Sequence, residues 1–278
     1  MTVVVTGATG TVGGLVVRRL LEAGREVRAV TRDPEGAVLP DSVEVVGGDL
    51  DVPDSLTRAF TGAEALLLIA RPATAADVAR LACRCGIGRI VTLSSMLADS
   101  EPPDAVGHRA MERAVEGVEV AWTHLRPGMF AANLLTWAPS IRATGVVREP
   151  YAAAAQTPIH EADIAAVAAT ALVGAGHAGR RYPLTGPQTL TKAEQVAAIG
   201  AGIGRALEFE EISPDEWRRE NADRVPPFVQ DFLLDIWARS AARPEPVLNT
   251  VAEVTGRPGR PLVEWAADRA AEFDGAPR

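Results

Sequence analysis

Cysteine and lysine are scarce in this 278-residue chain, which has two cysteines and a single lysine, Lys192. Cys83 and Cys85 lie two positions apart on a predicted helix, so their side chains point in different directions. No further cysteine and no pair of histidines lies near them in the sequence to complete a set of metal ligands. The cysteine content therefore argues against a disulfide framework and against a metal site.

The chain also lacks an excess of positive charge and a long apolar run. Its formal net charge is −8, and no basic stripe interleaved with aromatic residues is present, so we expect no nucleic-acid partner. The apolar run from Ala65 to Ala70 is far shorter than the ~20 residues that a membrane-spanning helix needs. The first predicted strand begins at residue 2, where a signal peptide would lie. We therefore expect a soluble cytoplasmic protein without a membrane partner, and a homodimer is one option for its oligomeric state.

Residues 3–32 carry the strongest pattern, which is a strand, a glycine turn, a helix and a second strand. An apolar run beginning at Val3 leads into Gly7, Gly10 and Gly13. Gly7 permits a backbone angle that a Cβ disfavours, Gly10 leaves room for a pyrophosphate, and Gly13 lets the helix pack close to the strand. The N–H groups at the start of the helix offer partial positive charge to phosphates. The pattern predicts a dinucleotide-binding unit, although its spacing is G-x-x-G-x-x-G rather than G-x-G-x-x-G.

Arg32 follows the second strand and bears on the choice of cofactor. Enzymes that select the dinucleotide without a 2′-phosphate usually carry Asp or Glu at this point, to bind the ribose hydroxyl. This chain has Thr31 and Arg32 instead, and a guanidinium can bind a phosphate through paired hydrogen bonds. The sequence therefore favours NADP(H) as cofactor. The alternative is a solvated surface arginine whose field the adjacent Asp33 weakens.

The alternation of strands and helices continues beyond the second strand and predicts an α/β fold with a doubly wound parallel Rossmann sheet. We expect residues 1–150 to form the NAD(P)-binding domain, with 157–186 returning to it. Residues 187–278 are expected to form a smaller, mostly helical substrate-binding lobe. The further elements predicted in order are strands at 43–46, 65–70, 89–94, 120–126, 181–185 and 207–212. The predicted helices begin at Pro53 and at Ser213 and span 73–85, 104–115, 130–143, 161–173, 191–203, 228–238 and 262–273.

Several segments together give the chain a family resemblance. They are TGATGTVG in the first turn, TRDP after the second strand, GDLDVPDSL after the third, LSS at the end of the fifth, HRAMERAVEGVEVAWTHLRPGMFAANL and TPIHEADIAAVAA. The chain resembles the NmrA-like group of atypical short-chain dehydrogenases/reductases over nearly its whole length, most weakly after residue 205. The resemblance implies NAD(P) bound across the carboxyl ends of the strands and a substrate enclosed by the C-terminal lobe.

The resemblance also implies roles for individual residues. Pyrophosphate contacts would come from the first glycine turn, the 2′-phosphate contact from Arg32, and adenine contacts from the segment after the third strand. The nicotinamide-side ribose and the nicotinamide would lie beside the ends of the fourth, fifth and sixth strands. The residues implied as cofactor-binding are Gly7, Thr9, Gly10, Thr11, Val12, Gly13, Arg32, Asp49, Leu50, Ile69, Ala70, Arg71, Ser94, Pro127 and Gly128. Asp49 has a second interpretation, as a residue that stabilises its own loop.

The catalytic positions depart from the family pattern. Standard members use Ser with a Tyr-x-x-x-Lys pair, in which the lysine lowers the pKa of the tyrosine. No Tyr-x-x-x-Lys occurs in this chain, and the alignment through WTHLRPG places His108 at the lysine position and Asp104 at the tyrosine position. His108 and Glu112 share a helix face, so Glu112 could orient the imidazole, which could donate a proton or contact the ribose. Tyr151 is the third catalytic candidate, as a phenol that could reach the substrate.

These features predict an NADP(H)-dependent oxidoreductase that acts on a hydrophobic, quinone-like or conjugated carbonyl acceptor. Such acceptors take up hydride with less help from a protein acid than a simple ketone needs, which fits the absence of the Tyr–Lys pair. Two alternatives stay open. One is a sensor that binds NADP(H) without turnover and reports to a partner protein. The other is a tailoring enzyme that catalyses a dehydration, cyclisation or isomerisation on the same fold.

Overall fold

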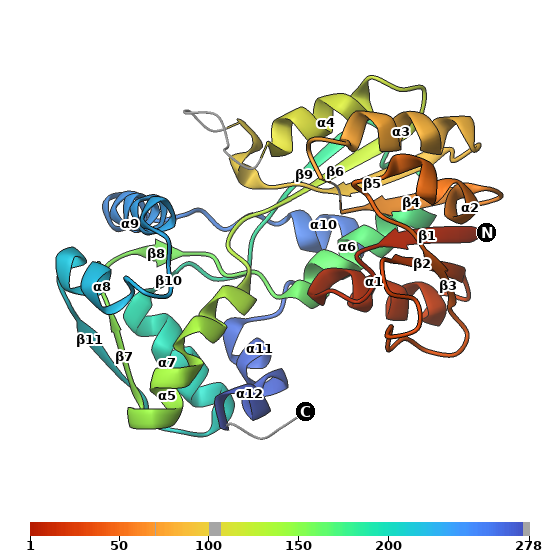
Figure 1. Ribbon diagram of the computed structural model, residues 1–278. Coiled ribbons are helices and arrows are strands. Elements are labelled where there is room, and N and C mark those ends of the chain that lie inside the picture. Colours follow the sequence, from red (N-terminus) through yellow and green to blue (C-terminus); the bar gives the residue numbers. More distant parts are fainter. Residues whose placement is uncertain (70, 100–106, 275–278) are drawn as a thin grey trace. The chain divides into compact units, whose positions relative to one another are not determined.

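The computed structural model of the protein describes residues 1–69, 71–99 and 107–274. No helix within these ranges is both long enough and apolar enough to cross a membrane. The chain divides into two compact units, which Figure 1 shows with their elements labelled.

Unit 1 comprises Met1–Gly128, Glu161–Leu184 and Thr250–Arg257, and unit 2 comprises Met129–His160, Thr185–Asn249 and Pro258–Arg278. The observed division differs in detail from the one drawn from the sequence. Residues 129–150 lie in unit 2, and a short segment late in the chain, 250–257, returns to unit 1.

Unit 1 is built on a parallel sheet with the strand order β3-β2-β1-β4-β5-β6-β9. The strands are β1 (Thr2–Thr6), β2 (Glu26–Thr31), β3 (Glu44–Gly47), β4 (Ala65–Leu68), β5 (Arg89–Leu93), β6 (Ala121–Pro127) and β9 (Arg180–Leu184). The strand order reverses at β1, which pairs with β2 on one side and with β4 on the other. Because every pairing is parallel, all the carboxyl ends lie at one edge of the sheet, and open sheets of this kind bind ligands at that edge beside the switch point.

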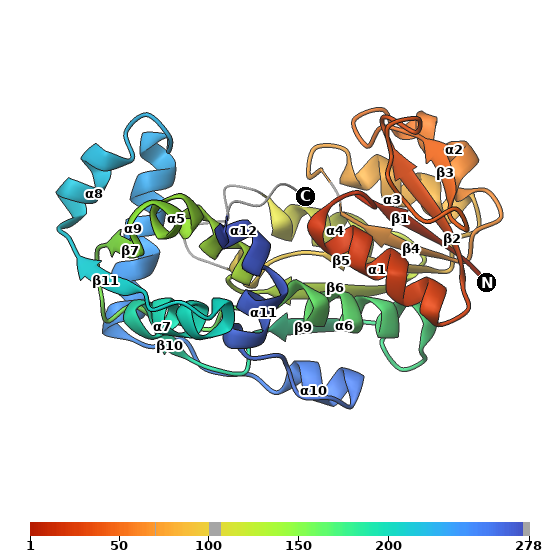
Figure 2. The ribbon, with the colours of Figure 1, turned by 90° about the horizontal axis from the view of Figure 1, so that it is seen from below.

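Helices cover both faces of this sheet (Figures 1 and 2). On one face, α1 (Thr11–Glu22) packs against α6 (Glu161–Val173), and α10 (Thr250–Thr255) packs on α6. The other face carries α2 (Thr57–Phe60), α3 (Ala75–Arg84) and α4 (His108–Glu116), and α3 contacts both of its neighbours.

Burial on both faces explains the continuous apolar character of the strands. Val4, Leu66 and Ile90 are neighbours in register on β1, β4 and β5, and each is fully buried. Removing an aliphatic side chain of this size from water contributes ~1.5–3 kcal/mol. The packed layer holds the strand ends, and therefore the loops that follow them, in fixed positions.

Unit 2 is mainly helical and contains two short ladders. β7 (Val146–Glu149) pairs in parallel with β11 (Glu208–Glu211), and β8 (Ala155–Gln156) pairs antiparallel with β10 (Leu190–Thr191). Its helical segments are the 3₁₀ helix η3 (Ala131–Trp137) and the helices α5 (Ala138–Thr144), α7 (Lys192–Ile203), α8 (Pro214–Glu220), α9 (Pro227–Ala242), α11 (Leu262–Asp268) and α12 (Ala270–Asp274).

The core of unit 2 forms where α7 packs against α11. Gly202 makes this approach close, since a Cβ there would lie 2.5 Å from the carbonyl oxygen of Val263. Trp265 on α11 is fully buried. α7 begins with a capping box: the Thr191 hydroxyl accepts from the Glu194 amide, and the Glu194 carboxylate accepts from the Thr191 amide at 2.8 Å.

The predicted fold class, a doubly wound parallel Rossmann sheet with a smaller helical C-terminal part, is confirmed. Several predictions about individual elements are wrong. The helix predicted over 262–273 is two helices, because the chain leaves helical geometry at Arg269 (φ −112°). The segment from Pro53 begins as the 3₁₀ helix η1 (Pro53–Leu56), and that from Phe130 begins as η3. β7, β8, β10 and α10 were not predicted, and β8 and β10, with two residues each, are too short to show a hydrophobic period.

Candidate functional site

The loop after β1 has the geometry of a phosphate cradle. Gly7 adopts a φ of +61°, in the left-handed region that favours glycine, and its carbonyl accepts from the Gly10 amide at 2.9 Å. A Cβ on Gly13 would lie 2.1 Å from the Gly7 carbonyl oxygen, so the close contact between loop and helix requires glycine there. The roles assigned to Gly7 and Gly13 from the sequence pattern match this backbone geometry.

The N-terminus of α1 is open to an anion. The cap residue Gly10 provides no side chain, and the first turn of the helix contains no acidic residue. Thr9 and Thr11 are exposed beside it, whereas the side chain of Val12 is buried, so Val12 can offer only its backbone N–H. Free N–H groups and the helix dipole together favour phosphate at such a terminus. The residues present therefore fit a dinucleotide pyrophosphate.

Arg32 follows β2 directly and is exposed. Among the described residues, no carboxylate is found in an ion pair with its guanidinium. The neighbouring Asp33 uses its carboxylate in its own turn, where Oδ1 accepts from the Gly36 amide at 3.0 Å. Arg32 is thus a cation at the carboxyl end of β2 that is available to a bound phosphate.

The ends of β3 and β4 carry the next predicted residues. Oδ1 of Asp49 accepts from the Asp51 amide at 2.9 Å, which is the loop-stabilising contact that the sequence left as its second interpretation. Leu50 packs partly into the core. The amide of Ile69 donates to the buried Thr6 hydroxyl at 2.8 Å, and the Ile69 side chain approaches Gly7.

Arg71 lies 3.3 Å from Asp51, Nε to Oδ2, in an exposed ion pair that links the loops after β3 and β4. Ala70, also predicted to bind cofactor, lies outside the described residues.

The ends of β5 and β6 complete the edge. The Ser94 amide donates to the Leu125 carbonyl at 2.7 Å, and the Gly128 amide donates to the Leu184 carbonyl at 2.9 Å. Pro127 is the last residue of β6. Since the sheet is parallel, the described cofactor-binding candidates after all six strands β1 to β6 lie at the same edge of unit 1.

A buried ion-pair network holds the carboxyl ends of β5 and β6 in place. Glu112 on α4 is fully buried, and its Oε1 accepts from the Ser94 hydroxyl at 2.6 Å and from Arg126 Nε at 2.8 Å. Its Oε2 accepts from Arg126 Nη2 at 2.6 Å and from Arg109 Nη1 at 3.0 Å. Burial opposes ionisation of Glu112, but the hydrogen bonds from Arg126 and Ser94 outweigh it and lower the pKa to about 2. Glu112 is therefore a permanent carboxylate at neutral pH.

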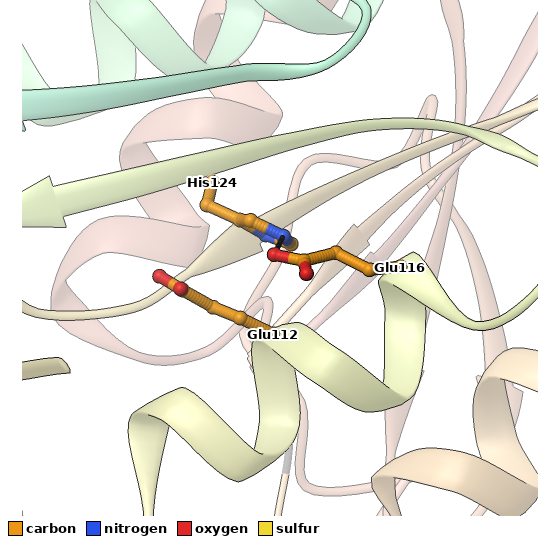
Figure 3. Close-up of side chains that lie close together, drawn as sticks. All are labelled: Glu112, Glu116 and His124. Atoms are coloured by element: carbon orange, nitrogen blue, oxygen red, sulfur yellow. Dashed lines mark ion pairs between the residues drawn. The ribbon is translucent and has the colours of Figure 1, made fainter. Parts of the chain in front are cut away.

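Glu112, Glu116 and His124 lie close together, as Figure 3 shows, with His124 on β6 and the two carboxylates on α4. Arginines occupy the carboxylate oxygens: Glu116 Oε1 accepts from Arg109 at 3.0 Å and from Arg181 at 2.5 Å. Guanidinium groups bind these oxygens, so the contacts of the cluster are those of an ion-pair network.

His124 is fully buried in this network. Its Nδ1 is bonded to the Thr92 hydroxyl at 2.6 Å, and its Nε2 lies 3.3 Å from Glu116 Oε1 without the alignment of a hydrogen bond. Burial lowers the pKa of His124 to about 4, against the opposing effect of Glu112 and Glu116. The imidazole is therefore neutral near pH 7.

The three catalytic candidates are divided between the units. His108 begins α4 and is half-buried, so it lies with Glu112 in unit 1, whereas Tyr151 belongs to unit 2. Glu112 is committed to Ser94, Arg109 and Arg126. Its role as an orienting group for His108 remains a prediction. Tyr151 has a φ of +59°, the one left-handed non-glycine backbone among the described residues, and its side chain packs beside Trp217.

The sequence interpretation missed the arginines of the network. The sequence contains two patterns that point to the network. Trp122, His124 and Arg126 alternate along β6 and share one face of the strand. Arg109, Glu112 and Glu116 share one face of α4. Only the packing of this helix on this strand shows that the two faces meet.

Known proteins are similar to this chain in sequence and in fold. A family model described as NAD(P)H-binding matches residues 7–174. The (4-alkanoyl-5-oxo-2,5-dihydrofuran-3-yl)methyl phosphate reductase of Streptomyces griseus is 40% identical over 98% of this chain and 99% of its own length. The NAD(P)H azoreductase of Xenophilus azovorans is 33% identical over 99% of this chain and 100% of its own length.

Among solved structures, the NADPH-dependent quinone oxidoreductase of Escherichia coli complexed with NADPH matches with a TM-score of 0.81 and 25% identity, covering 96% of this chain and 99% of that one. The predicted resemblance to the NmrA-like group of atypical short-chain dehydrogenases/reductases is thereby confirmed. The chain belongs to the NAD(P)H-binding family of oxidoreductases.

Proposed function

We propose that this protein is an NADPH-dependent reductase of a hydrophobic, conjugated acceptor such as a quinone or an enone. The observation that carries the proposal is the open cradle of Gly7, Gly10 and Gly13 at the N-terminus of α1, beside the switch point of the sheet. The cofactor, when bound, supplies a hydride from its nicotinamide ring.

The preference for NADPH over NADH rests on Arg32. Its exposed guanidinium follows β2 without a carboxylate partner among the described residues, and Asp33 is held in its own turn. A 2′-phosphate would gain a charge-assisted pair with Arg32, whereas a ribose hydroxyl would gain little.

The acceptor class follows from what the chain lacks and from what its relatives reduce. No Tyr-x-x-x-Lys pair is present to protonate a simple ketone. The relatives are named for a dihydrofuranone, azo compounds and a quinone, each of which has a conjugated, electron-poor bond system. Acceptors of this kind need orientation over the cofactor more than they need a strong acid.

Within this proposal, the residues of unit 1 have distinct tasks. Ser94, Pro127 and Gly128 fix the end of the cofactor site at β5 and β6, and the Ser94 hydroxyl is held by Glu112 at 2.6 Å. His108, at the start of α4, is the proton donor, because an imidazole can release a proton near neutral pH. Glu112 cannot share that task, since its pKa of about 2 keeps it ionised. Tyr151 of unit 2 stays, from the sequence, the candidate phenol for contact with the acceptor.

The experiment is NADPH oxidation at 340 nm with a panel of a quinone, an acyl butenolide, an azo dye and a simple ketone. We expect turnover with the conjugated compounds, little with the ketone, and weaker turnover when NADH replaces NADPH. A protein that binds NADPH but oxidises it with none of the four would be a sensor or a tailoring enzyme rather than a reductase. If the protein is a reductase and the imidazole is the proton donor, His108→Ala should lower turnover. If the protein is a sensor, His108→Ala should leave its NADPH affinity unchanged.

A further inference from the structure

The only lysine of the chain, Lys192, is buried in unit 2 and lies outside the cofactor-binding candidates. Its side chain is 2% exposed at the start of α7, and its Nζ donates to Glu149 Oε2 at 2.9 Å. Glu149 is the last residue of β7 and is also buried. A surface role is therefore excluded for this residue, and its charge must be balanced locally.

Two tryptophans complete the surroundings of this pair. The Lys192 ammonium lies 3.4 Å from the ring centroid of Trp237 on α9, in a cation–π contact. Trp137 donates from Nε1 to Glu149 Oε1 at 3.1 Å. We refer to Lys192, Glu149, Trp137 and Trp237 as the lysine cluster. Through it one ammonium connects α7, β7 and α9, which are distant from one another in the sequence.

The lysine cluster adjoins the corner that presents Tyr151. That corner follows Glu149 by two residues, and the left-handed φ of +59° at Tyr151 persists only if neighbouring contacts impose it. Two such contacts come from the β7–β11 ladder: the Ile212 amide donates to the Glu149 carbonyl at 3.2 Å, and the Ala152 amide donates to the Glu211 carboxylate at 2.9 Å. The Tyr151 side chain packs in one apolar cluster with Trp237.

We propose that charged Lys192 is a positioning residue for the acceptor. Lys192 holds the Tyr151 corner, and the face of α9 that carries Trp237, in the geometry that binds the acceptor. The claim about the acceptor rests on the proposed reductase function, whereas the claim about the corner and α9 does not. A methionine at position 192 could fill the same volume, but it could neither donate a hydrogen bond to Glu149 nor make a cation–π contact with Trp237.

The charge of Lys192 is adjustable. Burial lowers the pKa of Lys192 to about 8, against the opposing effects of Glu149 on β7 and Glu211 on β11. The charged residues Asp235 and Arg239 of α9 pair with each other at 2.8 Å. As the pH rises through 8, the ammonium becomes neutral and both of its contacts weaken. The acceptor KM should therefore rise between pH 7 and pH 9 while the NADPH affinity stays constant.

A structural test uses the fact that Lys192 is the only lysine. Protein grown with ε-¹³C-lysine gives one side-chain lysine signal in an NMR spectrum. We expect its ε-CH₂ protons to be shifted upfield by the Trp237 ring, to titrate near pH 8, and to lose the shift in Trp237→Leu. A signal at the position of a free lysine that titrates near its ordinary value would overturn the proposal.

The functional test compares Lys192→Met with Lys192→Arg. We expect Met to raise the acceptor KM about tenfold and to increase hydrogen exchange in residues 149–154 and α9, with NADPH affinity unchanged. Arg keeps the charge, so it should recover part of the KM and remove its pH dependence between 7 and 9. The control is Arg148→Met on the same strand, whose partners Glu210, Glu216 and Glu220 lie on β11 and α8.

The outcomes separate the two proposals. Unchanged exchange and unchanged KM in Lys192→Met would overturn the positioning role, even if the enzyme reduces quinones. Increased exchange in a protein that reduces none of the acceptors would reject the reductase function and retain the role of Lys192 in holding the corner. Equal effects of Lys192→Met and Arg148→Met on the KM would show that any lost cation matters, and would also overturn the proposal.

Discussion

Each unit of the protein contains a buried carboxylate that contacts a basic side chain, Glu112 in unit 1 and Glu149 in unit 2, and the two are held in different ways. In unit 1, Glu112 accepts from two arginines and a serine, and its pKa is lowered to about 2. In unit 2, Glu149 accepts from one lysine and one tryptophan, and burial lowers the pKa of that lysine to about 8. The first network is locked in its charged form, and the second can change its charge near physiological pH.

The chemistry of the cations explains this difference. A guanidinium stays protonated and binds a carboxylate through a planar fork, as Arg126 does with Nε and Nη2 on the two oxygens of Glu112. An ammonium is a compact charge that loses its proton more readily when it is buried. We infer that the network of unit 1 keeps the cofactor edge fixed, whereas the charge of the lysine cluster in unit 2 is adjustable.

The largest expected effect comes from removing the central cation of each network. Arg126→Met leaves Glu112 buried without its main partner, so the free energy of unfolding should fall by about 3–5 kcal/mol. Lys192→Met should cost less, because burial already disfavours the charged lysine and Glu149 retains its bond from Trp137. Urea unfolding of both variants measures the difference. Equal losses of unfolding free energy in the two variants would contradict the difference between a locked and an adjustable network.

Acid should act on unit 1 through Glu112. Because folding lowers the pKa of Glu112 from 4.5 to about 2, its stabilisation is complete above pH 4.5 and is lost as the pH falls from 4.5 to 2. The difference in unfolding free energy between the wild type and Glu112→Gln should therefore shrink by about 3 kcal/mol over that range. The Glu112 carboxylate also raises the pKa of His124, which titrates in the same range, so the same comparison in a His124→Gln background isolates Glu112. A difference that does not depend on pH would mean that Glu112 is not held ionised by Arg126.

The cofactor edge can be tested with two adjacent glycines. Gly13→Ala forces a Cβ to within 2.1 Å of the Gly7 carbonyl, so the cradle must shift, and NADPH affinity should fall about 30-fold, or about 2 kcal/mol. Gly14→Ala is the matched control, since its Cβ would lie 3.3 Å from the Ala8 carbonyl oxygen and needs only a small adjustment. Fluorescence titration with NADPH compares them. Similar affinities in the two variants would argue against the cradle.

The smallest expected effect concerns cofactor choice. Arg32→Ala should weaken NADPH binding about tenfold, or about 1.4 kcal/mol, and leave NADH binding unchanged, because only NADPH carries the phosphate. Arg18→Ala, an exposed arginine on α1, serves as the control for a general loss of charge. If NADPH and NADH weaken together, Arg32 does not read the 2′-phosphate.

The parts of the site that depend on neighbouring residues could be predicted from the sequence. Gly7, Gly10 and Gly13 follow one another within seven residues, and the doubly wound parallel sheet follows from the alternation of strands and helices. The Glu112–Arg126 contact joins a helix to a strand 14 positions away, and Lys192 meets Glu149 over 43 positions. Neither pair has a local signal. Arg269, where the last predicted helix breaks, has no proline or glycine beside it to mark the break.

The contrast between the fixed network of unit 1 and the adjustable lysine cluster is tested most directly by steady-state kinetics. NADPH oxidation by a quinone is measured at 340 nm, at pH 7 and at pH 9, over a range of concentrations of both substrates. With a pKa of about 8 for Lys192, its charged fraction falls about tenfold between these values. We expect the acceptor concentration for half-maximal rate to rise about tenfold, with the NADPH affinity constant. No oxidation of NADPH, or a parallel change in both affinities, would contradict the account.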